Sequence, residues 1–313
     1  MPYAFGVTLF LAALCSVFLG AADLRGEESG APKAAVLVSR NIRPYIEAVE
    51  GMNSVLSEAV NAKIQVFRLE KFKDKMRAVL IRRFIEEKFD LFVAVGPEAA
   101  GFAWEETGSE RAVRLYSMVL NPQKVSGRTE TACGIPLNIP AQRQLNMIAL
   151  GLPAIERIGL LYDPRYNSEF FRKAAAEASF LGLKIVPLQV LSKKDIPVIL
   201  KQHWKDMDAL WLIPDQTVIS ESIIQYIIRE ALFENTPVIG YNRFFYESGA
   251  ALAFVFDYEE IGRQTGRLAV NMLNGKACGR EVPVFHVWLN LRVIDKLGIS
   301  VPEEKSLPME AGP

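Results

Sequence analysis

The chain has 313 residues, half of them hydrophobic and 23% charged, so it can bury the cores of two globular lobes and is not disordered. Lys and Arg number 36, as do Asp and Glu, and this balance argues against a nucleic-acid binder that works by neutralising phosphates. Two His and three Cys are too few for a structural zinc cluster or a disulfide-dense scaffold.

The N-terminus has the pattern of an export signal. The stretch from Ala4 to Ala22 contains no charged residue, and it ends in Gly20-Ala21-Ala22. An apolar run with small side chains before the cleavage point is typical of a signal peptide. We therefore expect residues 1–22 to be removed and the rest of the chain to be periplasmic or otherwise extracytoplasmic. Two alternatives remain, a lipid anchor on Cys15 and an uncleaved membrane anchor.

From Lys33 onward, short apolar runs predict buried strands, and apolar residues spaced by three and four predict helices. The first set of strands is expected at 34–39, 63–69, 90–95 and 114–120, with helices at 46–60, 76–88 and 98–106. The second set is expected at 157–162, 184–188, 209–213 and 237–241, with helices at 169–181, 196–203 and 221–235. The last part is expected to hold strands at 249–256 and 282–291 and helices at 258–274 and 291–297. Two successive sets of β-α units predict two lobes with parallel sheets.

Ligands of open α/β sheets bind outside the carboxyl ends of the strands. This rule selects five loops, at residues 39–41, 96–98, 162–168, 214–217 and 241–243. Most of them precede a helix, whose first amide groups can hold an anion.

The motifs of nucleotide sites and of common catalytic sites are missing from the sequence. No glycine-rich dinucleotide or P-loop motif follows the first strand, and no Gly-x-Ser-x-Gly occurs. His203 and His286 do not follow a strand at its carboxyl end, and no clustered motif suggests a metal. We therefore expect a binding protein without a cofactor and not an enzyme.

The strand-end loops offer hydrogen-bonding groups. Asp215 with Thr217 could bind an ammonium or hydroxyl group, and Arg40 could clamp a carboxylate. Ser117, Asn167 and Ser168 could donate to a carboxylate, although Ser168 is better explained as a helix cap.

Cys133 and Cys278 remain after removal of the leader. An oxidising compartment would permit a bond between them. The simpler interpretation is two separate thiols, because the sequence alone does not place their Cβ atoms within bonding distance.

The order of several motifs resembles the solute-binding proteins of ABC importers of the tryptophan/tyrosine type. The resemblance runs from about Lys33 to Pro302. The segments that carry it include Val95-Gly96-Pro97-Glu98, Arg157-Ile158-Gly159-Leu160-Leu161-Tyr162-Asp163-Pro164, Pro214-Asp215-Gln216-Thr217 and Gly262-Arg263-Gln264-Thr265-Gly266.

The resemblance implies a type I periplasmic-binding fold, with two Rossmann-like lobes joined by three crossovers. Lobe one would comprise residues 33–130 and 256–280, and lobe two 131–255 and 281–302, with a flexible tail at 303–313. The implied ligand-binding residues, with those from the strand-end rule, are Ser39, Arg40, Gly96, Pro97, Ser117, Asn167, Ser168, Asp215, Thr217, Tyr241 and Asn242.

The implied function is that of a monomeric solute-binding protein. It would close about its hinge on a small amino-acid-like or carboxylate ligand and deliver the ligand to an ABC permease in the cytoplasmic membrane, with no nucleic acid involved. The alternative is a ligand-sensing extracytoplasmic subunit of a signalling system with the same fold. Gly96 and Arg40 depart from the family pattern, so the resemblance does not fix an aromatic amino acid as the ligand.

Overall fold

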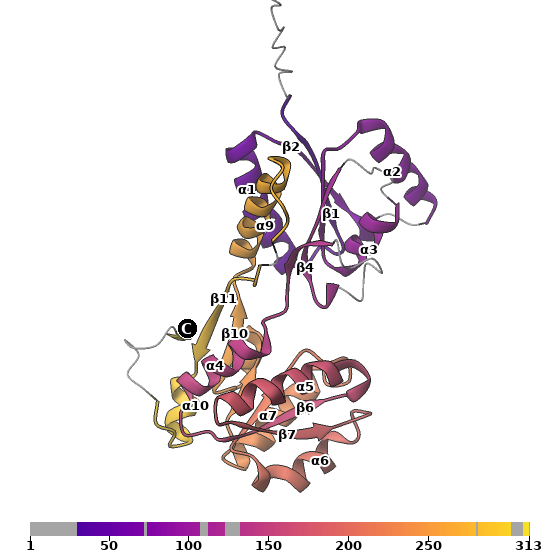
Figure 1. Ribbon diagram of the computed structural model, residues 1–313. Coiled ribbons are helices and arrows are strands. Elements are labelled where there is room, and N and C mark those ends of the chain that lie inside the picture. Colours follow the sequence, from indigo (N-terminus) through magenta and orange to yellow (C-terminus); the bar gives the residue numbers. More distant parts are fainter. Residues whose placement is uncertain are drawn as a thin grey trace, which may run out of the picture. The chain divides into compact units, whose positions relative to one another are not determined.

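The computed structural model describes residues 30–71, 74–106, 112–122, 132–279, 281–301 and 309–312. Its strands form two separate sheets, of five and seven strands, each with helices on both faces (Figure 1). We call the five-stranded sheet and its helices lobe one, and the seven-stranded sheet and its helices lobe two. The prediction of two α/β lobes with parallel sheets is confirmed. The predicted leader lies outside the described residues.

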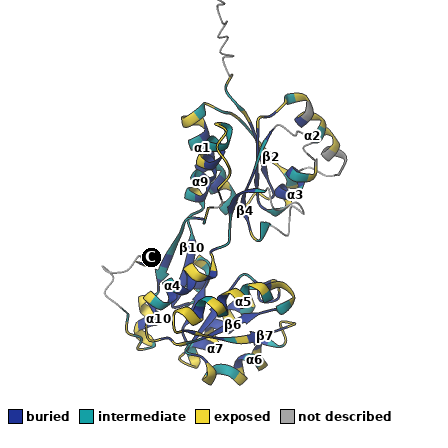
Figure 2. Ribbon diagram, viewed as in Figure 1, coloured by how far each residue is buried: buried dark blue, intermediate teal, exposed yellow. Residues whose placement is uncertain are grey.

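Lobe one has a fully parallel sheet. Its strands in spatial order are β2 (Lys63–Arg68), β1 (Lys33–Val38), β3 (Leu91–Val95), β4 (Val113–Val119) and β5 (Cys133–Pro136). The helices packed on one face are α1 (Arg43–Val60) and α9 (Tyr258–Leu273), and those on the other face are α2 (Asp74–Glu87) and α3 (Pro97–Glu106). Both faces of the sheet are therefore covered, and β1, β3 and β4 are almost wholly buried, whereas the edge strand β2 is mostly not (Figure 2).

Lobe two has a parallel sheet with one antiparallel pair, β10 with β11. Its strands in spatial order are β12 (Glu310–Ala311), β11 (Phe285–Leu289), β10 (Leu252–Phe256), β9 (Val238–Gly240), β8 (Ala209–Leu212), β6 (Arg157–Tyr162) and β7 (Lys184–Gln189). The helices of one face are α4 (Ala141–Gly151), α5 (Pro164–Phe180) and α10 (Leu291–Lys296), and those of the other are α6 (Ile196–His203), α7 (Glu221–Phe233) and α8 (Arg243–Glu247).

The chain passes between the two sheets three times. The first passage follows β5, which pairs with β4, so the predicted boundary at residue 130 lies too early. The boundary is wrong because the main-chain groups of β5 complete the edge of the lobe-one sheet. The second passage joins β10 to α9, and the third joins α9 to β11. Phe256, at the second passage, packs against hydrophobic clusters of both lobes.

The C-terminal residues contradict the prediction of a flexible tail where they are described. β12 pairs with β11 in parallel. Met309, just before it, is only 6% exposed and belongs to the core of lobe two. Gly151 makes room for this side chain, since a Cβ there would lie 2.8 Å from the Met309 sulfur. Burial of an apolar side chain and two strand pairings hold the segment in place.

Cys133 and Cys278 form a disulfide, so the interpretation as two separate thiols is wrong. The fold brings their Cα atoms to 5.9 Å although 145 residues separate them in sequence. Cys133 begins β5 and Cys278 follows α9, so the bond joins the lobe-one ends of the first and third passages.

Helix α9 lies side by side with α1 (Figure 1). The two helices approach at glycines. A Cβ on Gly262 would lie 2.0 Å from the carbonyl oxygen of Ala48, and one on Gly51 would lie 2.0 Å from that of Glu259. No side chain can be accommodated at such distances without separating the helices, so these glycines are required for backbone contact.

Gly262→Ala should separate α1 from α9 and lower the free energy of unfolding by about 1–3 kcal/mol, measured by urea unfolding. Gly101→Ala in α3 is the matched control, because a Cβ at Gly101 meets nothing within 4 Å. The control should be as stable as the native chain, or more stable by about 0.5–1 kcal/mol. Equal unfolding curves for both variants would contradict the packing described above.

Replacing both Cys133 and Cys278 by Ser should lower the free energy of unfolding by about 2–5 kcal/mol, because the bond closes a long loop in the unfolded chain. Reduction of the native chain should produce the same loss. Alkylation of the urea-unfolded chain followed by peptide mapping gives a direct check. Modification of either cysteine without reductant would contradict the bond.

Candidate binding site

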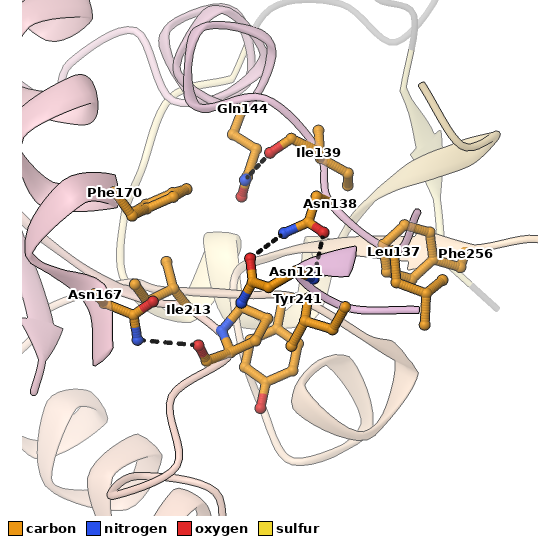
Figure 3. A pocket seen from close by; sticks show the side chains of 12 residues that line it. Asn121, Leu137, Asn138, Ile139, Gln144, Asn167, Phe170, Ile213, Tyr241 and Phe256 are labelled. Atoms are coloured by element: carbon orange, nitrogen blue, oxygen red, sulfur yellow. Dashed lines mark hydrogen bonds between the residues drawn. The ribbon is translucent and has the colours of Figure 1, made fainter. Parts of the chain in front are cut away.

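A pocket lies where the carboxyl ends of β4, β8, β9 and β10 meet the first passage between the lobes (Figure 3). Its volume is about 70 Å³. The lining consists of amide, aromatic, aliphatic and proline residues, namely Leu120, Asn121, Leu137, Asn138, Ile139, Gln144, Asn167, Phe170, Ile213, Pro214, Tyr241 and Phe256. A larger groove of about 770 Å³ adjoins it and shares five of these residues.

Three amide side chains on one side of the pocket come from the first passage and its neighbours. Asn121 and Asn138 are joined by two hydrogen bonds, from Asn121 N to Asn138 Oδ1 at 2.8 Å and from Asn138 Nδ2 to Asn121 Oδ1 at 2.9 Å. Gln144, in the first turns of α4, donates from Nε2 to the carbonyl oxygen of Ile139 at 2.9 Å. These bonds fix the segment after β5 against the end of β4.

A buried polar network occupies the ends of β6 and β8. Asp215 is 3% exposed and accepts three hydrogen bonds. The main-chain N–H of Asp163 and Nδ2 of Asn167 donate to its Oδ2 at 2.8 and 2.7 Å, and the N–H of Thr217 donates to Oδ1 at 2.8 Å. The carboxylate of Asp215 is therefore engaged by the protein, one layer behind the pocket wall that Asn167 forms.

Asp163 is the second carboxylate of this network and caps α5, accepting from the N–H of Arg165 at 2.9 Å. The guanidinium of Arg165 pairs with it, and the hydroxyl of Thr217 donates to it at 2.6 Å. The Arg165 side chain in particular holds the pKa of the buried Asp163 carboxyl well below its usual range.

Tyr241 reaches the pocket from the end of β9. Burial, and then the nearby charge of Asp215, raise the pKa of Tyr241 to about 12. The phenol therefore stays neutral at physiological pH. Asp215 itself does not line the pocket.

Four of the predicted site residues gather at the carboxyl ends of β1 and β3 in lobe one. Ser39 Oγ accepts from Ala99 N at 2.9 Å and so caps α3, which Pro97 begins. Gly96 has a φ of 92° and lies against Ser39 and Tyr45, where a side chain would clash. Arg40 pairs with Glu98 at 2.7 Å on the surface. None of these residues lines the two pockets described above.

Three further predicted residues form hydrogen bonds within the protein. Ser117 bonds the hydroxyl of Thr265 at 2.8 Å, which attaches β4 to α9. Ser168 donates to the carbonyl of Pro164 inside α5, so the expected helix cap at Ser168 is wrong and Asp163 has that role. Asn242 caps α8 by accepting from Phe245 N at 3.3 Å.

Of the predicted residues, Asn167 and Tyr241 line the smaller pocket. Asp215 and Thr217 lie behind it. Asn121 was not predicted as a site residue: it directly follows the strand expected at 114–120, but it lies outside the five selected loops. Asn138 and Gln144 lie between residues 121 and 156, where no helix or strand is expected from the sequence. No sequence motif in that segment indicates a binding residue.

Two α/β lobes that are joined by three passages, with a polar and aromatic pocket beside the first two, define a two-lobed protein of the type I periplasmic-binding class. Residues 45–310 match the ABC transporter substrate-binding proteins, and the chain belongs to that family. The suspected family is thereby confirmed.

Known proteins agree with this assignment. A curated tyrosine-binding protein of Clostridioides difficile is 22% identical over 214 residues, 64% of this chain and only 59% of that protein's length. A Streptococcus protein solved in complex with L-Trp superposes on this chain with a TM-score of 0.60 at 20% sequence identity. The match covers 90% of this chain and 98% of the Streptococcus chain. The ligand-free, open structure of a substrate-binding protein with adhesive properties from Clostridium difficile superposes with a TM-score of 0.74 at 19% sequence identity. The match covers 90% of this chain and 100% of the other.

The described part of the chain contains no helix that is long and apolar enough to cross a membrane. Within the same residues, no group of three or more His, Cys, Asp or Glu is placed to hold a metal ion.

The lowered pKa of Asp163 predicts a loss of stability in acid. A carboxyl whose pKa is lower in the folded state stabilises the fold above its unfolded pKa, and this stabilisation is lost as the pH falls through the folded pKa. Urea unfolding between pH 6 and pH 3 should therefore show a steeper loss for the native chain than for Asp163→Asn. Parallel pH profiles would contradict the assignment.

Proposed function

We propose that this protein is the extracytoplasmic solute-binding protein of an ABC importer. It binds a small amino-acid-like or carboxylate ligand between its lobes and presents it to a permease in the cytoplasmic membrane. The observation that carries the proposal is the pocket of amide and aromatic side chains beside the first two passages, in a chain of this family. Convergent polar groups in a largely apolar concave site are typical of small-molecule binding.

Two of the relatives described above support an amino-acid ligand. One is a tyrosine-binding protein, and another was solved with L-Trp. Phe170, Tyr241 and Phe256 supply aromatic surface in this chain's pocket, which suits a ligand with an apolar or aromatic side chain.

The disulfide supports export. Disulfides form and persist in oxidising compartments outside the cytoplasm, and Cys133–Cys278 joins residues far apart in the sequence. This agrees with the leader-like pattern of residues 1–22, which predicts removal of that segment.

The proposed mechanism is hinge closure about the three passages. Phe256 packs against clusters of both lobes, so the second passage is a point about which they can rotate while each core stays intact. Ser39, Arg40, Gly96 and Pro97 at the lobe-one strand ends would then approach a ligand already held in the pocket. The ligand favours the closed state by its greater affinity for it.

A thermal-shift screen of the twenty proteinogenic L-amino acids and small carboxylates should find at least one compound that raises the melting temperature. Small-angle scattering should show a smaller radius of gyration with that compound, as closure requires. Leu137→Trp fills the pocket and should abolish both effects. Leu150→Trp is the matched control, since Leu150 is 46% exposed on α4 and does not line the pocket. Failure of the whole panel would overturn the proposal.

A further inference from the structure

Two side-chain carbonyl oxygens face the pocket from neighbouring helices. Gln144 on α4 is 7% exposed, and Asn167 on α5 is 9% exposed. In Figure 3 both side chains reach toward the same space, next to Phe170. Within the described ranges, no hydrogen bond reaches Gln144 Oε1 or Asn167 Oδ1, whereas both NH₂ groups are bonded to the protein.

The protein fixes which end of each amide faces the pocket. Asn167 Nδ2 donates to Asp215 Oδ2 at 2.7 Å and to the carbonyl oxygen of Pro214 at 3.2 Å. A carboxylate and a carbonyl accept hydrogen bonds only, so a rotated amide would place oxygen against oxygen. Gln144 Nε2 is held in the same way by the carbonyl oxygen of Ile139. The pocket therefore receives acceptors from both residues and a donor from neither.

The carboxylate of Asp215 behind the pocket is negative, which favours the same kind of ligand group as the two acceptors do, a positively charged donor. Asp215 takes its three hydrogen bonds from uncharged donors. The partner of the other carboxylate, Asp163, is Arg165, whose guanidinium also donates to the carbonyl oxygen of Leu191 at 2.6 Å. Asp215 Oδ2 lies 2.7 Å from Nδ2 of Asn167, so its charge is only one side chain behind the pocket, and it adds to the effect of burial in raising the pKa of Tyr241. A cation in the pocket would be stabilised by this potential and an anion would be repelled.

We propose that Gln144 Oε1 and Asn167 Oδ1 form a paired acceptor that binds the ammonium group of the ligand, and that Asp215 is a positioning residue that acts through Asn167. This inference rests on the proposed function and specifies the chemistry of its site. It also assigns Asp215 a role different from the direct contact expected from sequence. The ligand's amino group, and not its carboxylate, is held on the lobe-two side.

The test compares three forms of one ligand by calorimetry on the chain without residues 1–22. They are the amino acid that binds most tightly in the screen, its deaminated carboxylate and its decarboxylated amine. For tyrosine these are L-tyrosine, 3-(4-hydroxyphenyl)propionate and tyramine. The amino acid should bind about ten- to a hundredfold more tightly than the deaminated form, since a charged hydrogen-bonded group is lost. Tyramine should bind more tightly than the propionate.

Variants assign the preference to the named oxygens. Asn167→Leu and Gln144→Met each replace an acceptor by an apolar side chain of similar size. Each should lower, several-fold, the ratio of the affinity for the amino acid to the affinity for its deaminated form. Ser179→Ala, at the far end of α5, is the control and should leave the ratio unchanged, because its hydroxyl bonds the carbonyl of Ala176 and Ser179 does not line the pocket. If Asn167→Leu does not fold, the effect of Gln144→Met on this ratio alone tests the paired acceptor.

The role of Asp215 is tested by a double-mutant cycle. Asp215→Asn should lower the ratio in the native background, because an amide at 215 no longer fixes the orientation of Asn167. In the Asn167→Leu background the loss should be clearly smaller, because only the potential of Asp215 is then removed. An equal loss in both backgrounds would show that Asp215 does not act through Asn167, and would overturn the positioning role.

The outcomes separate this inference from the function on which it rests. Equal affinity for the amino acid and its deaminated form would overturn the inference and leave the proposed function intact. Absence of binding by every compound of the screen would overturn the proposed function itself.

Discussion

The backbone contact between α1 and α9 is the constraint on which the rest of the structure depends. Gly51 and Gly262 allow two helices more than 190 positions apart in the sequence to meet main chain to main chain. Because α9 must reach lobe one to make this contact, the chain has to leave lobe two after Phe256 and return to it at β11. Two of the three passages follow from that requirement. The hydroxyl pair of Ser117 and Thr265 and the disulfide secure the same helix and its C-terminal extension to β4 and β5.

Charged and neutral side chains occupy different positions around the pocket. The charges of Asp163 and Asp215 are kept behind the wall, where main-chain N–H groups, Thr217 and Arg165 satisfy them. Neutral amides stand in front. If the lobes close as proposed, an ion placed directly in the wall would have to be desolvated whenever they closed without a ligand, at a large free-energy cost. A carboxylate that orients an amide and adds its potential avoids much of that cost.

Most of the strands and helices could be predicted from sequence, because apolar runs and three- and four-residue spacings report directly on buried faces. What could not be predicted depends on contacts between distant segments. β5 has only four residues and is a strand because β4 provides its partner. β12 has two and depends on β11. The strand-end rule located Asn167, Tyr241 and Asp215, but a sequence does not say whether a carboxylate faces the ligand or the protein. Asn138 and Gln144 follow a passage between lobes whose position depends on β5.

The return of α9 also determines the order in which the two lobes can be completed as the chain emerges from its amino terminus. The face of the lobe-one sheet that carries α1 is not fully covered until residue 273 has appeared. The segment from Ala141 to Phe256, by contrast, contains five strands of lobe two with the helices that cover them, in one uninterrupted stretch. Lobe one is thus begun first but stays incomplete while five strands of lobe two are made, and Cys133 in β5 cannot form its disulfide until a cysteine 145 positions later has been made.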